Sequence, residues 1–390
     1  MQSQQTRYYW VDILKVFGIF LIYYGHVLQR TYRLSPDAVF FQYKLIYAFH
    51  LPLFFFISGF FYKNNKDSKF TEIGVLFQKR IFPVLLFLGI SFLIWPVYLY
   101  VKFREIDYDF LIQNLIFLLE GKPHISATLW FLVCLFVVEI WALLLLPKIK
   151  TVLQGILLSS FFLYFGYVLT AIPELEAYYI LPKNFWYIHE SVLAFGFYAM
   201  GYSTFRWMKK LVELNPILRI ALLIFFGWIT VWSVNLNSPS DSFVVVLKAS
   251  EHGNLYFFLS AFSGILATIF LASFIPRSRW LDYIGKNTLI LLGTNSLFMS
   301  FFNSHIVGWL GHQASTALVI FDSLWISVLT IGLSVPVIEI LNRWLPQLVG
   351  KPQVDGPIIK KISPPQFIFL RKNFEILSQK TGRIRDDQKS

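Results

Sequence analysis

Long apolar runs are the feature that most constrains how this chain folds. A helix needs about 20 consecutive apolar residues to cross the roughly 30 Å hydrocarbon core of a bilayer. Ten apolar runs approach or reach that length, at residues 11–29, 45–62, 81–101, 128–147, 151–171, 187–204, 217–236, 255–275, 284–302 and 318–341. Only 14% of the residues are charged, against about 25% in an average soluble domain. The sequence therefore predicts an all-α, polytopic transmembrane bundle of about ten spanning helices.

The distribution of lysine and arginine predicts the orientation of this bundle. The termini and the loops expected on their side of the membrane carry 25 lysines and arginines, whereas the opposite loops carry 8. Cytoplasmic loops are enriched in these residues, so we expect both termini in the cytoplasm. The net charge of +12 then reflects topology, and we expect membrane lipids as partners and no nucleic acid.

The two ends of the chain and its cysteine content complete this outline. The first apolar run lacks the pattern of a cleaved signal peptide, so we interpret it as the first membrane helix. Residues 346–390 are predicted to form a basic cytoplasmic tail that is attracted to anionic lipid headgroups. A single cysteine, Cys134, excludes an intrachain disulfide. His305 and His312 are too far apart in a loop to indicate a metal pair, so no metal site is expected.

The first apolar run carries three ionisable residues, Asp12, Lys15 and His26. At about 100° per residue, Lys15 and His26 lie on one helix face, roughly 16 Å apart along the axis. Asp12 and Lys15 have the i, i+3 spacing of an ion pair. Ionisable residues in a membrane helix usually face the protein interior or a wet cavity. Two simpler explanations remain open: Asp12 and Lys15 reach the cytoplasmic interface, and His26 is hydrated at the outer end.

The second run and the loop after it add further polar positions. His50 is expected at the same outer level as His26, and Ser58 and Gly59 allow close approach of another helix. Lys79 and Arg80 precede the third run. They either anchor the helix at the cytoplasmic surface or contact phosphate groups.

Three motifs together resemble the acyltransferase 3 family of integral membrane proteins. They are D-I-L-K-x-x-G-I-x-L-I-x-x-G-H from residue 12, F-H-x-P-L-F-F-F-I-S-G-F from residue 49 and K-R-x-x-P from residue 79. The resemblance extends from residue 8 to about 340 and is closest to the fucose 4-O-acetylase branch. It implies that residues 1–345 form a transmembrane acyltransferase domain in the bacterial cytoplasmic (inner) membrane.

The same resemblance implies an activity. Family members transfer an acyl group, usually acetyl, from cytoplasmic acyl-CoA to a hydroxyl of a glycan or lipid-linked sugar. Acetyl-CoA would be a co-substrate, and no permanently bound cofactor is expected. Two positions depart from the family pattern. Lys15 replaces an arginine, which keeps the charge but loses the planar guanidinium, and Asn295 stands where relatives often have a histidine.

Acyl transfer to a hydroxyl requires a base, and imidazole titrates near neutrality. We therefore expect His26 to act as general base, either directly or through an acyl-histidine relay, while Asp12 and Lys15 organise the cytoplasmic end of the same path. Lys79, Arg80 and Lys15 are the predicted donor contacts. His50, Trp130 and Asn254 are the candidate acceptor contacts; packing at a helix start, an aromatic belt at the membrane interface and a loop cap are the respective alternatives. Glu139 lies inside the fourth apolar run without an assigned role.

Two other classes of protein fit a polytopic chain with intramembrane charges. A transporter or flippase of lipid-linked glycans would show matching interrupted helices in two pseudo-symmetric halves. The charges here are concentrated in the first helix instead. A sugar-binding receptor without chemistry is the third possibility. Binding and turnover of acyl-CoA distinguish the enzyme from both.

Overall fold

The computed structural model describes residues 8–31, 36–63, 69–104, 107–171, 184–237, 256–298 and 315–362. Within these ranges the regular elements are helices and there is no strand, so the all-α prediction is confirmed. The predicted contact Asn254 and the histidines at 305 and 312 lie outside the described residues.

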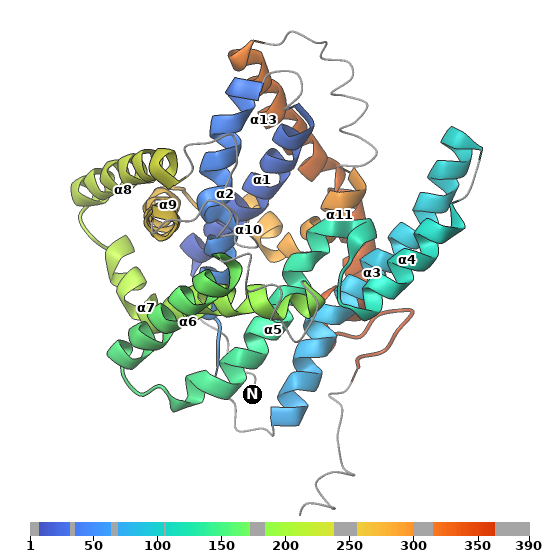
Figure 1. Cartoon of the computed structure of the whole chain (residues 1–390), viewed down its shortest axis with the longest axis horizontal. Helices are drawn as coiled ribbons and strands as arrows, with labels where there is room; N and C mark the ends of the chain where they lie inside the picture. The colour runs from blue at the N-terminus through green and yellow to red at the C-terminus, as the bar shows by residue number, and fades with distance from the viewer. Residues whose placement is uncertain are drawn as a thin grey trace, which may run out of the picture.

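Figure 1 shows the described helices coloured in chain order. In chain order they are α1 Tyr9–Thr31, α2 Pro36–Gly59, α3 Lys69–Phe103, α4 Tyr108–Leu119, α5 Trp130–Leu145, α6 Val152–Ala171, α7 Ile188–Val212, α8 Pro216–Asn237, α9 Tyr256–Ala272, α10 Arg279–Lys286, α11 Thr288–Phe298, α13 Thr316–Leu333 and α14 Val335–Trp344. Short 3₁₀ helices lie between or after these helices, among them η1 His124–Leu129, η4 Phe185–Tyr187 and η7 Pro346–Val349.

Seven helical stretches among the described residues are long and apolar enough to cross a membrane. The chain is therefore a multi-pass membrane protein, while the number ten and the orientation of the termini stay predictions. The predicted runs at 187–204, 255–275 and 284–302 do not qualify. α7 has charged residues near both ends and many small or polar residues between them, and α9 and α11 have 17 and 11 residues.

α1 and α2 lie at the centre of the bundle, and α7 crosses α2 at very short range (Figure 1). A Cβ atom at Gly59 would lie 2.0 Å from the carbonyl oxygen of Tyr198. A Cβ atom at Gly201 would lie 1.9 Å from the carbonyl oxygen of Phe56. Only glycine permits this crossing, as small residues commonly do between membrane helices.

α3 begins earlier than the hydropathy pattern predicts. The sequence placed residues 63–80 in a loop, but the helix starts at Lys69 and runs for 35 residues. At 1.5 Å per residue it is about 52 Å long, which exceeds the roughly 30 Å hydrocarbon core. The prediction failed because hydropathy detects only the apolar part of a helix that extends beyond the membrane. Lys79 and Arg80 therefore lie on a continuous helix.

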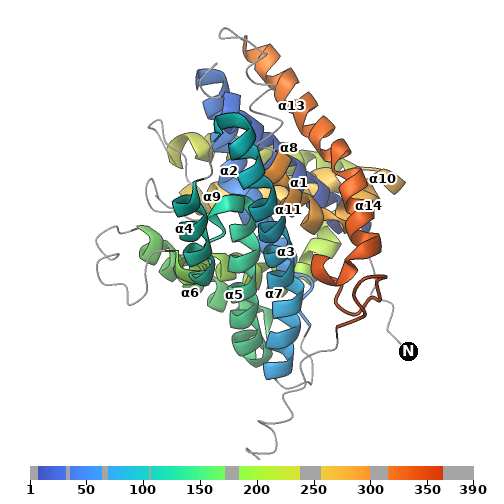
Figure 2. The same ribbon diagram turned by 90° about the vertical axis from the view of Figure 1, so that its right-hand side faces the viewer.

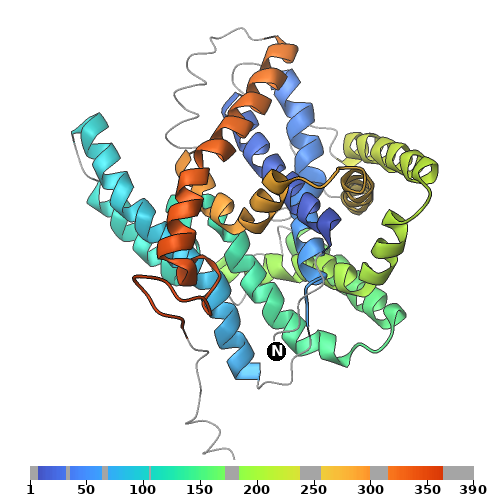
Figure 3. The ribbon, with the colours of Figure 1, turned by 180° about the vertical axis from the view of Figure 1, so that it is seen from behind.

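The segment after α14 packs on the bundle. Ser334 separates α13 from α14 (Figure 2). Pro336 lies in the first turn of α14. η7 then packs against α3, and the loop that follows lies beside the same helix (Figure 3). The buried Gln347 amide donates to the carbonyl oxygens of Val354 and Ile359, each at 2.6 Å. Residues 346–362 of the predicted tail thus have a fixed place next to α3.

Candidate functional site

A cavity of about 880 Å³ lies between α1, α2, α3, α5 and the α10–α11 connection. Each of these elements contributes several side chains to its wall, and α7 adds Tyr198. Gly350, in the C-terminal segment, closes one side. This glycine has a φ of +86°, a left-handed conformation that glycine adopts without steric cost.

The wall of the cavity changes from polar to apolar along its length. The polar end, which we call the mouth, is formed by residues near the start of α1 and α3 and the ends of α2 and α10, including Tyr62, Lys63, Glu72 and Lys286. The opposite end is apolar. It is formed by Ile19, Ile22, Phe54, Phe131 and Leu292. An amphiphilic ligand with an anionic head and an apolar tail matches this gradient.

α1 lines the cavity with a single stripe of side chains. Asp12, Lys15, Ile19 and Ile22 all contribute to the wall, and their spacing keeps them on one helix face. His26 is the next residue on that stripe. It does not itself line the cavity, and it lies about one helical turn beyond Ile22.

Two predicted residues of the α1 stripe contact each other at the mouth side. The Nζ atom of Lys15 lies 3.6 Å from Oδ1 of Asp12, as the i, i+3 spacing predicts. The same ammonium lies 4.3 Å from the ring centroid of Phe61, within cation–π range. Lys15 is therefore held at the cavity wall by a carboxylate on its own helix and an aromatic ring after α2.

Arg80 and Glu139 form a bidentate ion pair across the cavity wall. Nε of Arg80 donates to Oε2 of Glu139 at 2.8 Å, and Nη2 donates to Oε1 at 2.6 Å. The pair joins α3 to α5, and both side chains line the cavity. This contact gives Glu139 the role that the sequence left open: it balances the charge of Arg80 and fixes its guanidinium.

The described wall has an excess of positive charge. It includes the basic side chains of Lys15, Lys63, Lys79, Arg80 and Lys286 and three carboxylates. Glu139 compensates the charge of Arg80. The main cations at the mouth are therefore Lys63, Lys79 and Lys286. Burial, with added repulsion from Glu72, raises the pKa of Tyr62 to about 12, so its phenol stays neutral at the same end.

His26 belongs to a group of polar side chains beyond the apolar end. Its Nδ1 atom lies 3.0 Å from Oε1 of Gln29. The Gln29 amide donates to the hydroxyls of Tyr43 and Tyr47. The buried His50 donates from Nδ1 to the Ile46 carbonyl oxygen at 2.8 Å, and its ring lies 4.6 Å from that of Tyr47.

Both predicted histidines, His26 and His50, belong to this polar group. Gln29 and Tyr47 link His26 to His50, because Gln29 contacts both His26 and the Tyr47 hydroxyl and the Tyr47 ring packs on His50. Both histidines therefore contact one group of side chains, while their shared level in the membrane stays a prediction.

The other candidates lie away from the cavity. Trp130 packs its ring against Tyr187, with the centroids 5.6 Å apart, and is not part of the wall. Asn295 is fully buried on α11, beside the Tyr23 hydroxyl. Tyr23 donates to the Leu291 carbonyl oxygen at 2.9 Å, so this region ties α1 to α11.

Sequence reasoning missed several residues of the site. Ile22 and Leu292 look like any other membrane-helix residues, and nothing in the sequence marks them as cavity wall. Gln29 follows His26 by three residues, a spacing that brings the two side chains together on a helix. This spacing is therefore a sequence signal for the contact between His26 and Gln29.

Comparison with known proteins yields one match. A family model described as an acyltransferase domain, of the acyltransferase 3 type, matches residues 8–342. No curated protein and no solved structure matches the chain. The matched region contains the whole cavity wall except Gly350.

Proposed function

Because the chain belongs to the acyltransferase 3 family and is therefore an acyltransferase with a multi-pass membrane architecture, we propose that it is an O-acetyltransferase. It takes the acetyl group from acetyl-CoA on the cytoplasmic side and transfers it to a hydroxyl of a glycan or lipid-linked sugar. We place it in the bacterial cytoplasmic membrane, with both termini in the cytoplasm. The observation that carries the proposal is the cavity that leads from a basic mouth to the level just below His26.

The mouth suits the nucleotide of acetyl-CoA. Lys63, Lys79 and Lys286 place three ammonium groups around one end of the cavity, and ammonium groups bind phosphate as point charges. Arg80 is held by Glu139, so we assign it to fixing the charge and shape of this wall and Lys79 to direct phosphate contact. Lys15, held by Asp12, lies beside the path of the pantetheine arm.

The depth of the cavity suits the length of that arm. From Asp12 to Ile22 the α1 stripe rises about 15 Å at 1.5 Å per residue. An extended chain of about five residue lengths covers a similar distance. A pantetheine arm entering at the mouth therefore brings its thioester to the level of Ile22, one helical turn below His26.

The hydrogen bond to Gln29 gives His26 the correct form for a general base. An amide oxygen only accepts hydrogen bonds, so Nδ1 of His26 carries the proton and Nε2 keeps its lone pair. Nε2 takes the proton of the acceptor hydroxyl while the hydroxyl oxygen bonds to the acetyl carbon. The carbon–sulfur bond then breaks, and the thiolate leaves as CoA and recovers the proton. The net products are an O-acetyl ester and the free thiol.

The acceptor approaches from the side of His26 that faces away from the cavity. His50 is linked to His26 through Tyr47 and Gln29, and we assign it to orienting the acceptor. Trp130 and Asn254 remain our proposed acceptor contacts at the same side of the membrane. Direct transfer is the route we propose, with His26 as base throughout.

Acetyl transfer by the purified protein in nanodiscs tests this function. Wild-type protein is incubated with radiolabelled acetyl-CoA and a membrane extract that contains lipid-linked glycans, and label in the glycan fraction is counted. We expect His26→Ala to lower transfer by at least 100-fold, since general base catalysis contributes about 10²–10⁴-fold. His124→Ala is the matched control, because His124 is an exposed histidine outside the cavity. Equal rates for the two variants would contradict the proposal.

A further inference from the structure

We propose that Ile22, Phe131 and Leu292 form a wall that restricts the donor to short, uncharged acyl groups, with acetyl the preferred one. This inference rests on the proposed function, because it concerns the acyl group carried into the same cavity. We call these three residues the acyl wall.

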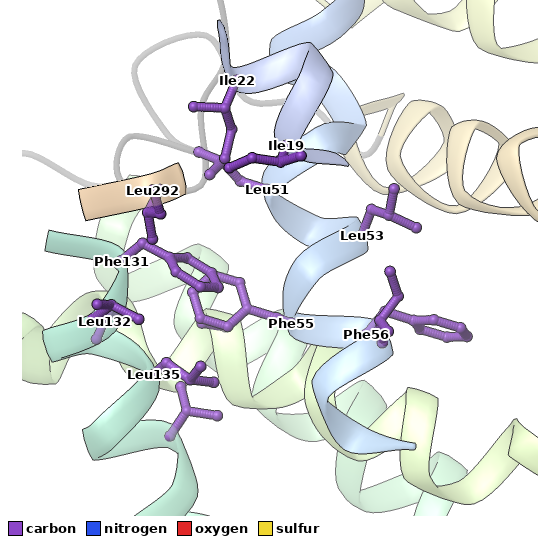
Figure 4. Close-up of a cluster of buried hydrophobic side chains, with 14 of the residues drawn as sticks. Ile19, Ile22, Leu51, Leu53, Phe55, Phe56, Phe131, Leu132, Leu135 and Leu292 are labelled. Carbon is purple, nitrogen blue, oxygen red and sulfur yellow. The ribbon is translucent and has the colours of Figure 1, made fainter. Parts of the chain in front are cut away.

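The acyl wall lines the apolar end of the cavity with side chains from three helices. Ile22 comes from α1, Phe131 from α5 and Leu292 from α11, and all three line the cavity. Figure 4 shows them among packed apolar side chains that include Ile19, Leu51 and Phe55. The exposed fractions of the three are only 5%, 6% and 5%. An acyl chain that extends past the thioester carbonyl therefore meets closely packed side chains.

Contacts behind the acyl wall hold it in place. The Thr128 hydroxyl donates to the carbonyl oxygen of Leu292 at 3.1 Å, which fixes α11 against η1. The Phe131 ring lies 4.8 Å from the ring of Phe55 and 5.6 Å from that of Phe54. A well-packed wall does not yield to an extra methylene without strain. This rigidity is what converts the shape of the wall into selectivity for acyl length.

The chemistry of the wall also selects against charge. The lining residues at this end are apolar, and the charged residues Lys15 and Glu139 lie on turns nearer the mouth. A carboxylate at the end of a dicarboxylic acyl group would lose its water there without gaining a partner, which is costly. An acetyl group, which is short and neutral, meets neither obstacle.

The test compares two neighbouring leucines. Leu292→Ala enlarges the cavity at the acyl wall, whereas Leu291→Ala truncates a neighbouring buried leucine that does not line the cavity. Each variant is assayed in nanodiscs with acetyl-, propionyl- and butyryl-CoA, and the ratio of butyryl to acetyl turnover is recorded. One methylene in a closed apolar pocket discriminates by about 10- to 200-fold. We expect the ratio to rise at least tenfold in Leu292→Ala and to stay at the wild-type value in Leu291→Ala.

A second variant covers the possibility that Leu292→Ala does not fold. Ile22→Val removes one methylene from the acyl wall, and Ile13→Val is its control on α1, buried but outside the cavity. We expect a rise in the propionyl to acetyl ratio with Ile22→Val only. An unchanged ratio in folded variants of both wall positions would overturn the acyl wall while leaving the proposed function intact. Absence of turnover with every acyl-CoA, in wild type as well, would overturn the proposed function and the acyl wall together.

Discussion

Removing one partner of the Arg80–Glu139 pair gives the sharpest prediction for stability. Glu139→Ala leaves the guanidinium of Arg80 without its carboxylate in a region where both side chains are largely shielded, with exposed fractions of 25% and 10%. Breaking a fully buried pair in this way costs about 3–5 kcal/mol. The cavity gives Arg80 some access to water, so we expect a loss of about 2–3 kcal/mol in the free energy of unfolding.

The companion variant separates the ion pair from the packing. Replacing both residues, as Arg80→Met with Glu139→Leu, removes the unpaired charge and keeps much of the apolar volume. Such replacements of a whole pair are often neutral or stabilising. We therefore expect the double variant to be more stable than Glu139→Ala alone, which is the signature of a coupled pair.

Unfolding in mixed micelles, followed by tryptophan fluorescence during titration with SDS, measures these differences. Glu213→Ala is the control, because Glu213 is an exposed residue at the end of α7. If Glu139→Ala and Glu213→Ala lose the same stability, or if the double variant is less stable than Glu139→Ala, the reasoning about this pair is wrong.

Three further predictions follow from particular contacts. Lys79→Gln should raise the KM for acetyl-CoA by up to about tenfold and make that KM less dependent on salt, because a salt-screened phosphate contact is lost. Steady-state kinetics at two ionic strengths measure both effects. The control Lys210→Gln should change neither the KM nor its salt dependence. Gly201→Leu should prevent the α2–α7 crossing, because a Cβ would lie 1.9 Å from the Phe56 carbonyl oxygen. Size-exclusion chromatography should then show loss of the monodisperse protein. The control Gly227→Leu should remain monodisperse, because a Cβ at Gly227 meets open space. Tyr23→Phe should cost about 1 kcal/mol of unfolding free energy, the usual value of one hydrogen bond, and the micelle titration would contradict this if the loss exceeded 3 kcal/mol.

Much of the α1 side of the site was predictable from the sequence. The period of the helix places Asp12, Lys15 and His26 on one stripe, and the structure shows the first two on the cavity wall. The pairing of Asp12 with Lys15 follows from their spacing, since both partners belong to one helix.

The rest of the site depends on contacts between distant segments, which local pattern does not carry. Glu139 was visible as a charge in an apolar run, but its partner Arg80 lies 59 residues away. Leu291 and Leu292 are adjacent leucines, and only packing decides that one of them faces the cavity. The start of α3 at Lys69 was missed because a helix that leaves the membrane no longer shows an apolar pattern.

The most direct test of the central claim asks whether acyl-CoA occupies the cavity between α1, α2, α3, α5 and α11. Cys134, the single cysteine, is buried, and a Cys134→Ser background allows one new cysteine at a time. Ser58→Cys places a thiol on the cavity wall, and Gln154→Cys places one on an exposed surface outside it. We predict that acetyl-CoA slows alkylation of the Ser58→Cys variant at least tenfold and leaves that of Gln154→Cys unchanged. Equal alkylation of the Ser58→Cys variant with and without acetyl-CoA, at concentrations that support turnover, would contradict the account.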